Sequence, residues 1–278
     1  MSVKSMTDLS LFGGTGYIGS TYERMYPGNV IIPRGQRHFD TKNVLYFIST
    51  TTNQNVFQDL QVDIDVNLKI FTEFLSHCKR TDTVINFVSS GFVYGNDILD
   101  AKETDCCNPT GFYSITKRCA EQLLVSYCET FGIKYRIFRI GNVFGIDPTV
   151  SQGKNVLGYM IRRLKNDDYI VLYDGGNYVK DYMHVEDVCS AMNLLMDESD
   201  TNNIYNIGTG VSRSFREVIE FAKDYVGSNS ELISAEMPED QKYLQIKNFT
   251  MNVDKLSSYG HVPNLTIDTG VEMICKAY

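Results

Sequence analysis

The sequence lacks any apolar run that approaches the roughly 20 consecutive residues a transmembrane helix needs. Its beginning, MSVKSMTDLS, is polar and lacks the apolar stretch of a secretory signal. These two absences predict a cytoplasmic protein that makes no use of a membrane.

Disulfide and metal-site patterns are also missing. None of the seven cysteines belongs to a CxxC pair, and no cysteine–histidine group has the spacing of a zinc site. Because the count is odd and several cysteines lie in apolar helical segments, we expect reduced, buried thiols and no metal site.

Positive charge is scarce, since 26 Lys and Arg residues stand against 34 Asp and Glu, a net charge of −8 at pH 7. This balance argues against nucleic acid as a partner, because binding a polyanion requires a basic face. An anionic substrate gains no attraction from the molecule as a whole. Any phosphate site must therefore be built locally from arginines, lysines and helix N-termini.

The chain does contain short apolar runs that alternate with longer helical patterns, without a repeat or a Pro/Gly/Ser linker. The apolar runs are residues 9–12, 29–33, 43–50, 82–90 and 134–145, and the helical patterns among them are 17–25, 66–79 and 113–131. Strands this continuously apolar belong in a parallel sheet with helices on both faces. The predicted fold class is α/β, a Rossmann-type doubly wound parallel sheet.

After about residue 148 the predicted elements become short and irregular, which indicates a smaller, discontinuous C-terminal lobe. We expect residues 1–148, with a returning segment at about 177–203, to form a dinucleotide-binding domain. Residues 149–176 and 204–278 are expected to form the substrate-binding lobe.

The segment SLFGGTGYIGS places Gly13, Gly16 and Gly19 in the pattern G-x-x-G-x-x-G, between a predicted strand and a predicted helix. Glycines let the backbone approach a pyrophosphate, and the helix N-terminus offers it free N–H groups. In this context the pattern predicts a bound NAD or NADP. Tyr17 and Ile18, which open the helix, are included in the predicted cofactor site.

The second apolar run is followed by arginines and by no carboxylate, in the segment NVIIPRGQR. An acidic residue at this place favours NAD and a basic one NADP, so Arg34 is the candidate for a 2′-phosphate contact. The alternative is that Arg34 is a solvated loop charge. Ser49 and Thr50, at the end of the third run, are further candidates for cofactor contacts. The connection 34–42 is so short that a usual helix and strand are absent from this half.

A candidate proton-transfer site combines Ser90, at the end of the fourth apolar run, with Tyr113 and Lys117 on the following helix. Because Tyr113 and Lys117 stand at i and i+4, they face the same side. We expect the Lys117 ammonium and an oxidised nicotinamide to lower the pKa of Tyr113 from about 10 toward neutrality. Ser90 would bind the same substrate oxygen as the phenol.

Taken together, the segments FGGTGYIGS, SSGFVYG, YSITK, RIGNVFG, YVKDYMHVEDV and YNIGTG resemble the extended short-chain dehydrogenase/reductase family, in its nucleotide-sugar epimerase/dehydratase branch. The resemblance implies an enzyme that holds NAD or NADP and acts on a nucleoside-diphosphate sugar, as in polysaccharide biosynthesis. It implies catalysis by Ser90, Tyr113 and Lys117. It also implies a homodimer formed by helices 66–79 and 114–131.

Substrate contacts are carried over by position from the same resemblance. Asn142 matches a residue near the substrate diphosphate, and Lys180 stands where the family has a phosphate-binding arginine. A lysine keeps the charge but loses the bidentate geometry of an arginine. Lys154 and Asn155 open a helix at the place where the family often binds the nucleotide; a capped helix with a solvated lysine is the alternative.

The sequence identifies the family more specifically than it identifies the reaction. The 4,6-dehydratases carry an Asp-Glu pair after the serine or threonine, whereas this chain has Gly91 and Phe92, which cannot transfer a proton. Two enzyme hypotheses remain, namely reduction of a 4-keto (including 6-deoxy) sugar nucleotide, which we favour, and 4-epimerisation with tightly held NAD. A third hypothesis is a cofactor-binding scaffold or sensor without turnover.

Overall fold

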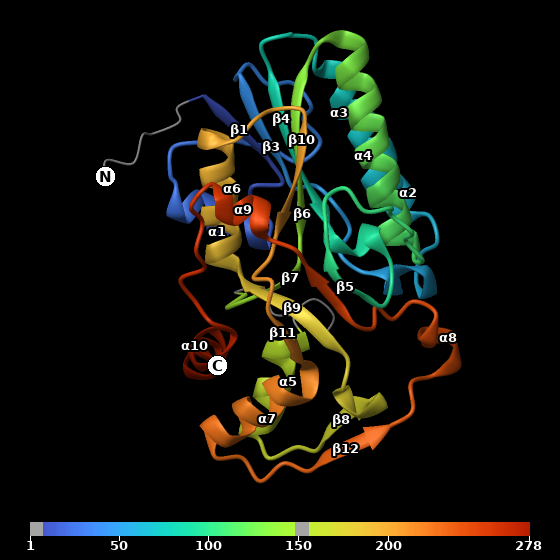
Figure 1. Cartoon of the computed structure of the whole chain (residues 1–278), viewed down its shortest axis with the longest axis vertical. Coiled ribbons are helices and arrows are strands. Elements are labelled where there is room, and N and C mark those ends of the chain that lie inside the picture. The colour runs from blue at the N-terminus through green and yellow to red at the C-terminus, as the bar shows by residue number, and fades with distance from the viewer. Residues whose placement is uncertain (1–7, 148–155) are drawn as a thin grey trace.

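The computed structural model describes residues 8–147 and 156–278 (Figure 1). Within these residues the main layer is a six-stranded sheet in the order β10-β6-β4-β3-β1-β2, and every neighbouring pair is parallel. Its strands are β1 (Leu9–Phe12), β2 (Val30–Ile32), β3 (Asn43–Tyr46), β4 (Val84–Ser90), β6 (Lys134–Ile140) and β10 (Asn203–Ile207). The chain runs outward from β1 in both directions, so the predicted doubly wound parallel sheet is confirmed.

Helices cover both faces of this sheet (Figure 1). One face carries α1 (Tyr17–Met25), α6 (Val185–Glu198) and α9 (Asp254–Ser258), and the other carries α3 (Ile70–His77) and α4 (Phe112–Phe131). Neighbouring strand residues point to opposite faces, since Leu11 packs in the cluster with α1 and α6, and Phe12 packs in the cluster with α3 and α4. Both faces of each strand are apolar for this reason.

The core beneath α3 and α4 is largely aromatic. The ring centroids of Phe12 and Phe74 are 4.7 Å apart, those of Phe71 and Phe87 are 4.8 Å apart, and Tyr46 lies 5.1 Å from Phe71. Such large, close-packed rings bury much apolar surface for each residue. They fix the distance between the sheet and the helices α3 and α4, the second of which carries Tyr113 and Lys117.

Two predicted elements differ in extent because side chains or a glycine redirect the backbone. The run 43–50 ends as a strand at Tyr46, and four residues later the Thr50 N–H donates to the Asn67 side chain at 2.9 Å. The run 134–145 divides at Gly141, whose N–H donates to the Ile207 carbonyl at 3.0 Å. Beyond it, β7 (Asn142–Phe144) pairs with β9 (Val179–His184) outside the main sheet.

The predicted helix 66–79 begins earlier and is not uniform. A short 3₁₀ segment η1 (Asn53–Phe57) precedes α2 (Val62–Ile64), the π-helical turn η2 (Asp65–Lys69) and then α3. A π-helical turn inside a helix is uncommon and is found mostly at functional sites. Here it places Asn67 against α4.

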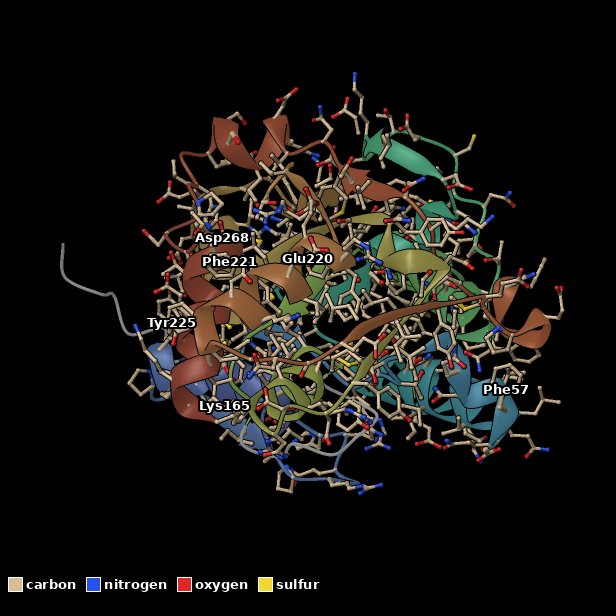
Figure 2. All side chains as sticks on the ribbon, turned by 90° about the horizontal axis from the view of Figure 1, so that it is seen from below. Phe57, Lys165, Glu220, Phe221, Tyr225 and Asp268 are labelled. Carbon is tan, nitrogen blue, oxygen red and sulfur yellow. The ribbon has the colours of Figure 1, made fainter. Side chains whose placement is uncertain are left out.

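A second, smaller sheet links the main sheet to a C-terminal lobe. It contains β11 (Ser212–Ser214), β9, β13 (Phe249–Met251) and β5 (Ile98–Ala101) in that order, with η3 (Gly91–Tyr94) beside it. The lobe consists of α5 (Val156–Lys165), α7 (Phe215–Val226), α10 (Ile267–Ala277), the parallel pair β8 (Ile170–Tyr173) and β12 (Leu232–Ala235), and the short elements η4 (Asp174–Gly176) and α8 (Glu239–Lys242). Figure 2 shows the lobe from below, where Lys165 and Tyr225 line a shallow pocket of about 360 Å³.

The division into a dinucleotide domain and a substrate lobe remains a prediction, and two elements of the predicted lobe pack with the main sheet. The predicted lobe segment 204–278 begins inside β10, which pairs with β6 in the main sheet. Leu256 of α9 also packs in the cluster under α1 and α6. Within the described residues, no helix has the length and apolar character needed to span a bilayer.

The connection between β2 and β3 contains residues 33–42 and no helix. β2 is consequently an edge strand with Val30 and Ile31 partly exposed. The short connection predicts that a usual helix and strand are absent, and the sheet accordingly ends at β2.

We expect Phe74→Ala to lower the free energy of unfolding by about 3–5 kcal/mol, because Phe74 is fully buried among four other rings. Phe57→Ala is the matched control, since Phe57 is 48% exposed (Figure 2) and its loss should change stability by about 0.5 kcal/mol or less. Urea unfolding of both variants measures the difference. Equal losses would contradict the aromatic core as the anchor of α3.

Candidate active site

The glycine turn after β1 brings α1 into direct contact with the backbone of the turn. Gly13 has a φ of +82°, and its carbonyl accepts a hydrogen bond from the Gly16 N–H at 3.0 Å. A Cβ on Gly19 would lie 2.5 Å from the Gly13 carbonyl oxygen and 2.8 Å from the Gly14 Cα. Only a glycine at position 19 allows the helix to pack this closely.

The first turn of α1 is suited to an anion. Gly16 is its N-cap and, among the described residues, no side chain caps the helix. The backbone N–H groups at Tyr17 and Ile18 therefore lack a side-chain acceptor and coincide with the positive end of the helix dipole. These residues fit the pyrophosphate of a dinucleotide.

The Tyr17 side chain supplies a separate polar group at the same place. Its hydroxyl is buried and has no hydrogen-bond partner within the described part of the chain. A Cβ on Gly145 would lie 2.7 Å from this hydroxyl oxygen and 3.1 Å from Nε2 of His184. Burial raises the pKa of Tyr17 above its usual value, so the group is a neutral phenol.

The two arginines after β2 differ in their surroundings. Arg37 is mostly buried and pairs with Glu73 at 3.3 Å. Arg34 is exposed, and no described residue forms an ion pair with it. Of the two, Arg34 is the one whose guanidinium is available to a phosphate, in keeping with its predicted role.

Ser49 and Thr50 are held by Asn67, a residue that the sequence analysis did not select. The Asn67 Oδ1 accepts hydrogen bonds from the Ser49 hydroxyl at 3.0 Å and the Thr50 N–H at 2.9 Å. The Asn67 amide donates to the hydroxyls of Thr50 at 2.8 Å and Thr116 at 2.9 Å. A single buried amide thus joins the loop after β3 to α4.

The beginning of α4 is fixed by Asn53, which reaches it from η1. The Asn53 Oδ1 accepts from the Ser114 N–H at 3.2 Å and the Ser114 hydroxyl at 3.1 Å, which satisfies free donors of the helix N-terminus. The N-cap residue Gly111 has no room for a side chain, because a Cβ there would lie 2.1 Å from the Asn53 side chain. Tyr113 is therefore set in the first turn of a firmly held helix.

The structure brings the predicted catalytic residues together. Ser90 ends β4, and its hydroxyl is hydrogen-bonded to Tyr113. Tyr113 is 9% exposed and Lys117 is 2% exposed. The Lys117 ammonium donates to the Val88 carbonyl at 2.7 Å and lies 4.1 Å from the centroid of the Phe87 ring.

Lys117 does not produce the expected lowering of the Tyr113 pKa, and the effect of an oxidised nicotinamide stays a prediction. Burial raises the pKa of Tyr113 to about 12, and the hydrogen bond to Ser90 only partly opposes this. The Lys117 ammonium donates to the carbonyl of Val88 on β4 and not to the phenol. Burial also lowers the pKa of Lys117 to about 7, against an opposing effect from Glu121.

A buried ion pair anchors the rest of α4. Glu121 accepts from both Nε and Nη2 of Arg139 on β6, at 3.1 and 2.8 Å, and from the Ser89 hydroxyl at 2.6 Å. Arg118, which is partly exposed, forms a second ion pair with Glu121 at 2.8 Å. The pKa of Glu121 is consequently low in spite of its burial.

On the substrate side, the pairing of β7 with β9 brings two predicted contacts near each other. Asn142 is opposite Tyr182, two residues from Lys180, and its amide donates to the Asp181 carbonyl at 3.4 Å. Lys180 is largely buried and has no ion pair with a described residue, and burial lowers its pKa to about 8. Lys154 and Asn155 lie outside the described residues.

Three buried polar residues that position the site were missed from the sequence: Asn53, Asp63 and Asn67. A signal did exist for two of them. Asp63 and Asn67 stand at i and i+4, in line with the buried Phe71 and Phe74, so they interrupt an otherwise apolar helix face. For Asn53 no comparable signal existed, because its contact with Ser114 spans 61 residues.

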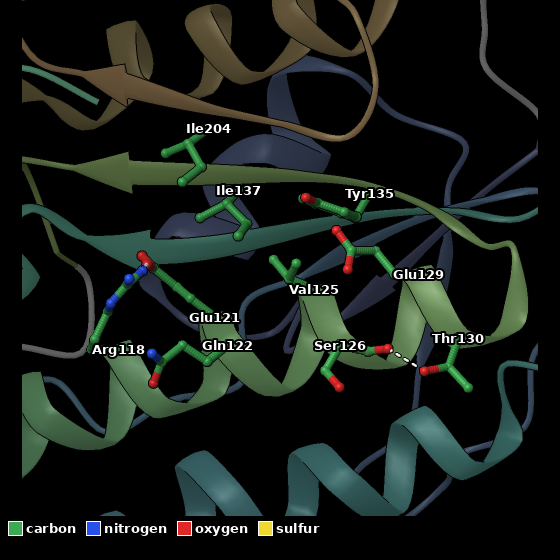
Figure 3. A pocket seen from close by; sticks show the side chains of 10 residues that line it. All are labelled: Arg118, Glu121, Gln122, Val125, Ser126, Glu129, Thr130, Tyr135, Ile137 and Ile204. Atoms are coloured by element: carbon green, nitrogen blue, oxygen red, sulfur yellow. Dashed lines mark hydrogen bonds and ion pairs between the residues drawn. The ribbon is translucent and has the colours of Figure 1, made fainter. Parts of the chain in front are cut away.

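A groove of about 670 Å³ runs beside α4 (Figure 3) but does not include the candidate catalytic residues. Val125 and Glu129 of α4 line one side, and Ile137 of β6 and Ile204 of β10 line the other. Ser90, Tyr113 and Lys117 are absent from its lining, so it is separate from the proton-transfer site.

Among curated proteins, the chain is 27% identical over 316 residues to the low-salt glycan biosynthesis protein Agl12 of Haloferax volcanii, with 98% of each chain covered. Its structure is similar to the UDP-glucose 4-epimerase of Thermus thermophilus solved with NAD, with a TM-score of 0.82, 23% identity, and 96% of this chain and 97% of that one covered. RMD from Pseudomonas aeruginosa, complexed with NADPH, gives a TM-score of 0.82 at 20% identity, with the same coverage. At these identities the two structures establish the shared fold.

Residues 36–208 match the sequence model of the NAD dependent epimerase/dehydratase family. That range is more than half of the chain and contains Ser90, Tyr113 and Lys117, while the glycine turn precedes it. The predicted resemblance to nucleotide-sugar enzymes of the extended short-chain type is confirmed, and the chain belongs to the NAD dependent epimerase/dehydratase family.

Proposed function

We propose that this protein is an NAD(P)-dependent oxidoreductase of nucleoside-diphosphate sugars that reduces a 4-keto sugar nucleotide, the 6-deoxy forms included. The observation that carries the proposal is the buried, hydrogen-bonded phenol of Tyr113, whose pKa of about 12 keeps it protonated at neutral pH. Reduction of a ketone requires a proton donor, and a protonated phenol is one.

The residues of this chain divide the task of proton delivery. Tyr113 donates its proton to the 4-oxygen as carbon 4 is reduced, and the resulting phenolate then takes a proton from solvent. Ser90 donates to the same oxygen and holds it in line with the phenol. Lys117 fixes α4 to β4 through the Val88 carbonyl, so that the phenol stays at the end of the strand.

The cofactor would be held by groups already described. The glycine turn and the first turn of α1 would bind the pyrophosphate, Arg34 the 2′-phosphate of NADP, and Ser49 and Thr50 the nearby ribose side. When bound, NADPH supplies the hydride. The exposed Arg34 and the absence of a carboxylate after β2 favour NADP over NAD.

Packing around Gly91 and Phe92 argues against dehydration. A Cβ on Gly91 would lie 2.7 Å from the ring of Phe249, and Phe92 contacts that ring edge-on with centroids 6.3 Å apart. The place where the 4,6-dehydratases carry an acid and a base is thus filled by an apolar cluster. A side chain at position 91 would therefore require Phe249 of β13 or the backbone of η3 to move.

The second candidate is a nucleotide-sugar 4-epimerase with tightly held NAD, which the similarity to the Thermus thermophilus enzyme favours. Epimerisation begins with the removal of a proton from the 4-hydroxyl, which requires the phenolate. Burial of Tyr113 disfavours that form, so we place reduction first.

The remaining expectations about assembly belong to the same proposal. We expect the C-terminal lobe to bind the sugar nucleotide and two copies to associate through α3 and α4. Ile115 and Leu123 on α4 are exposed apolar residues of the kind such an interface would cover. The predicted cytoplasmic location also stays a prediction.

The test is a panel of nucleotide sugars and their 4-keto derivatives, followed by the loss of NADPH absorbance. We expect a 4-keto substrate to be reduced, and Tyr113→Phe to lower kcat by about 10²- to 10⁴-fold with cofactor affinity retained. Tyr127→Phe on the same helix, whose hydroxyl donates to the Cys78 carbonyl, should keep full activity. Interconversion of isomers without net oxidation would favour the epimerase, and release of a 4-keto-6-deoxy product from a simple nucleotide sugar would refute the argument from Gly91.

Arg34→Asp should reverse cofactor preference. Loss of a charge-assisted hydrogen bond of about 1.5–3 kcal/mol predicts an NADP affinity roughly 10- to 100-fold weaker, with NAD affinity unchanged or improved. Titration of both dinucleotides by calorimetry measures the ratio. Lys42→Asp makes the same charge change at an exposed site in the same connection and should leave the ratio unchanged. An unaltered ratio in Arg34→Asp would remove this residue from the site.

Lys180 predicts a pH dependence of substrate binding. Because burial lowers its pKa to about 8, Lys180 is charged below that pH and neutral above it. The affinity for a nucleoside diphosphate should therefore decline as the pH rises through about 8. Lys180→Arg keeps its charge at alkaline pH and should abolish the decline, whereas the exposed Lys134→Met should leave it intact. Calorimetry with UDP and dTDP provides the profile, and an identical decline in Lys180→Arg would exclude a phosphate contact.

A further inference from the structure

Two residues with hydroxyl side chains follow β3 beside the glycine turn. A Cβ on Gly13 would lie 3.2 Å from the backbone nitrogen of Ile48, so the turn packs on the residues directly before Ser49 and Thr50. Both Ser49 and Thr50 are partly exposed. They lie at the carboxyl end of the sheet, which is where an open α/β sheet binds its ligands.

A backbone donor decides the orientation of the Asn67 amide. The Thr50 N–H can only donate, so the Asn67 atom that it meets at 2.9 Å is the oxygen Oδ1. This oxygen is also 3.0 Å from the Ser49 hydroxyl, which therefore donates its proton to it. The amide nitrogen donates to the hydroxyls of Thr50 at 2.8 Å and Thr116 at 2.9 Å. Every donor and acceptor of this amide, which is 3% exposed, is then in use.

Asp63 decides the direction of the Thr50 hydroxyl. Because the Thr50 oxygen already accepts from Asn67, its own proton goes to the second neighbour, Oδ1 of Asp63. Asp63 lies on α2 and is 1% exposed, and the Asn55 amide donates to the same oxygen at 2.9 Å. A carboxylate can only accept, so the Thr50 proton is directed to a buried partner.

Most of this network serves the loop after β3. Three of the four hydrogen bonds of the Asn67 side chain go to Ser49 and Thr50, and the fourth goes to Thr116 on α4. A buried polar network whose members are all satisfied holds a single arrangement. The arrangement held here is the direction in which two partly exposed hydroxyls point their protons.

We propose that Ser49 and Thr50 form an acceptor subsite whose ligand is a hydrogen-bond donor of the dinucleotide, a ribose hydroxyl and not a phosphate. With both protons bound inside the protein, the hydroxyl oxygens have only lone pairs left, two on Ser49 and one on Thr50. An ionised phosphate is itself an acceptor and gains nothing from such oxygens, whereas a ribose hydroxyl donates to them. Asp63 and Asn67 are positioning residues, since they act through the two hydroxyls.

This inference rests on the proposed function for the presence of a dinucleotide, and it names the group that the loop after β3 recognises. It divides the recognition of NADP between two places. The exposed Arg34, a cationic donor, is suited to the 2′-phosphate, and the acceptor subsite is suited to a hydroxyl. Both riboses of the dinucleotide carry a hydroxyl, so the experiment distinguishes them.

The first experiment measures what each ribose hydroxyl contributes to binding. Calorimetry compares NADP with two analogues, in which fluorine replaces the free hydroxyls of the adenosine ribose or those of the nicotinamide ribose. Fluorine cannot donate a hydrogen bond. We expect one analogue to bind roughly 2- to 10-fold more weakly, as for the loss of one hydrogen bond, and that analogue identifies the ribose. Equal affinities for NADP and both analogues would overturn the proposal.

Variants of the loop then assign that loss to the acceptor subsite. Ser49→Ala and Thr50→Val each remove one acceptor oxygen, and the ratio of the two affinities should fall toward unity in the variant that has lost the oxygen in use. Thr51→Ala is the matched control, because it removes an exposed hydroxyl from the same loop and should keep the full ratio. An unchanged ratio in both Ser49→Ala and Thr50→Val would refute the subsite.

The positioning role of Asp63 is tested with a conservative and a disruptive variant. Both hydrogen bonds of Asp63 end on Oδ1, an oxygen that asparagine retains, so Asp63→Asn should keep the affinity for NADP. Asp63→Leu frees the Thr50 proton, lets this hydroxyl act as a donor, and should weaken NADP binding roughly 2- to 10-fold. Equal affinities of the two variants would contradict the role of Asp63. If Asp63→Leu does not fold, the ratios in Ser49→Ala and Thr50→Val decide.

Failure of this inference is distinguishable from failure of the proposed function, because binding is measured without a sugar. If the affinities depend on a ribose hydroxyl but no 4-keto sugar is reduced, the function fails and this inference stands. If reduction occurs and the affinities do not depend on the hydroxyls, the function stands and this inference fails. A protein that binds neither NAD nor NADP would refute both.

Discussion

The contact between the end of β4 and the first turns of α4 is the constraint on which the candidate site depends. Val88, Ser89 and Ser90 are consecutive on the strand, and their respective partners Lys117, Glu121 and Tyr113 are spaced four residues apart on the helix. A helix advances about 6 Å in four residues and a strand about 3.3 Å in one. The helix therefore has to lie across the strand end at one position for all three contacts to form. A shift of one turn would separate the phenol from Ser90.

This contact contains charges that do not serve stability alone. Glu121 and Arg139 compensate each other, but the Lys117 ammonium has a carbonyl and a ring as its neighbours, and Asp63 has only neutral donors. Removing an ion from water costs several kcal/mol unless a partner offsets it. Perturbed pKa values gathered in one place, as for Tyr113 and Lys117, are characteristic of functional sites. The aromatic core under α3 and α4 provides the apolar burial that offsets such costs.

The small second sheet connects this chemistry to the lobe. β7 continues the chain from β6 at the carboxyl end of the main sheet, where an open α/β sheet binds its ligands, and pairs with β9. Asp181, between Lys180 and Tyr182, accepts from the N–H groups of Thr209 and Gly210 and so fixes the glycine turn after β10. The predicted diphosphate contacts Asn142 and Lys180 thus lie on a rigid ladder and not on a free loop. Their role in binding stays a prediction.

The sequence by itself determined the local features of this protein. Continuous apolar runs predicted the parallel sheet, the glycine spacing predicted the turn into α1, and the i, i+4 spacing placed Tyr113 and Lys117 on one helix face, because each depends on backbone geometry within a few residues. It could not determine how the protein's own groups set the ionisation of Tyr113: Lys117 does not lower the pKa as expected, and burial raises it to about 12. That value depends on burial and on Asp63, 50 positions earlier in the chain, and the direction of the Lys117 ammonium depends on a carbonyl of β4. Tertiary structure decided these matters because desolvation and Coulomb interactions act through space, between residues that only the fold brings together.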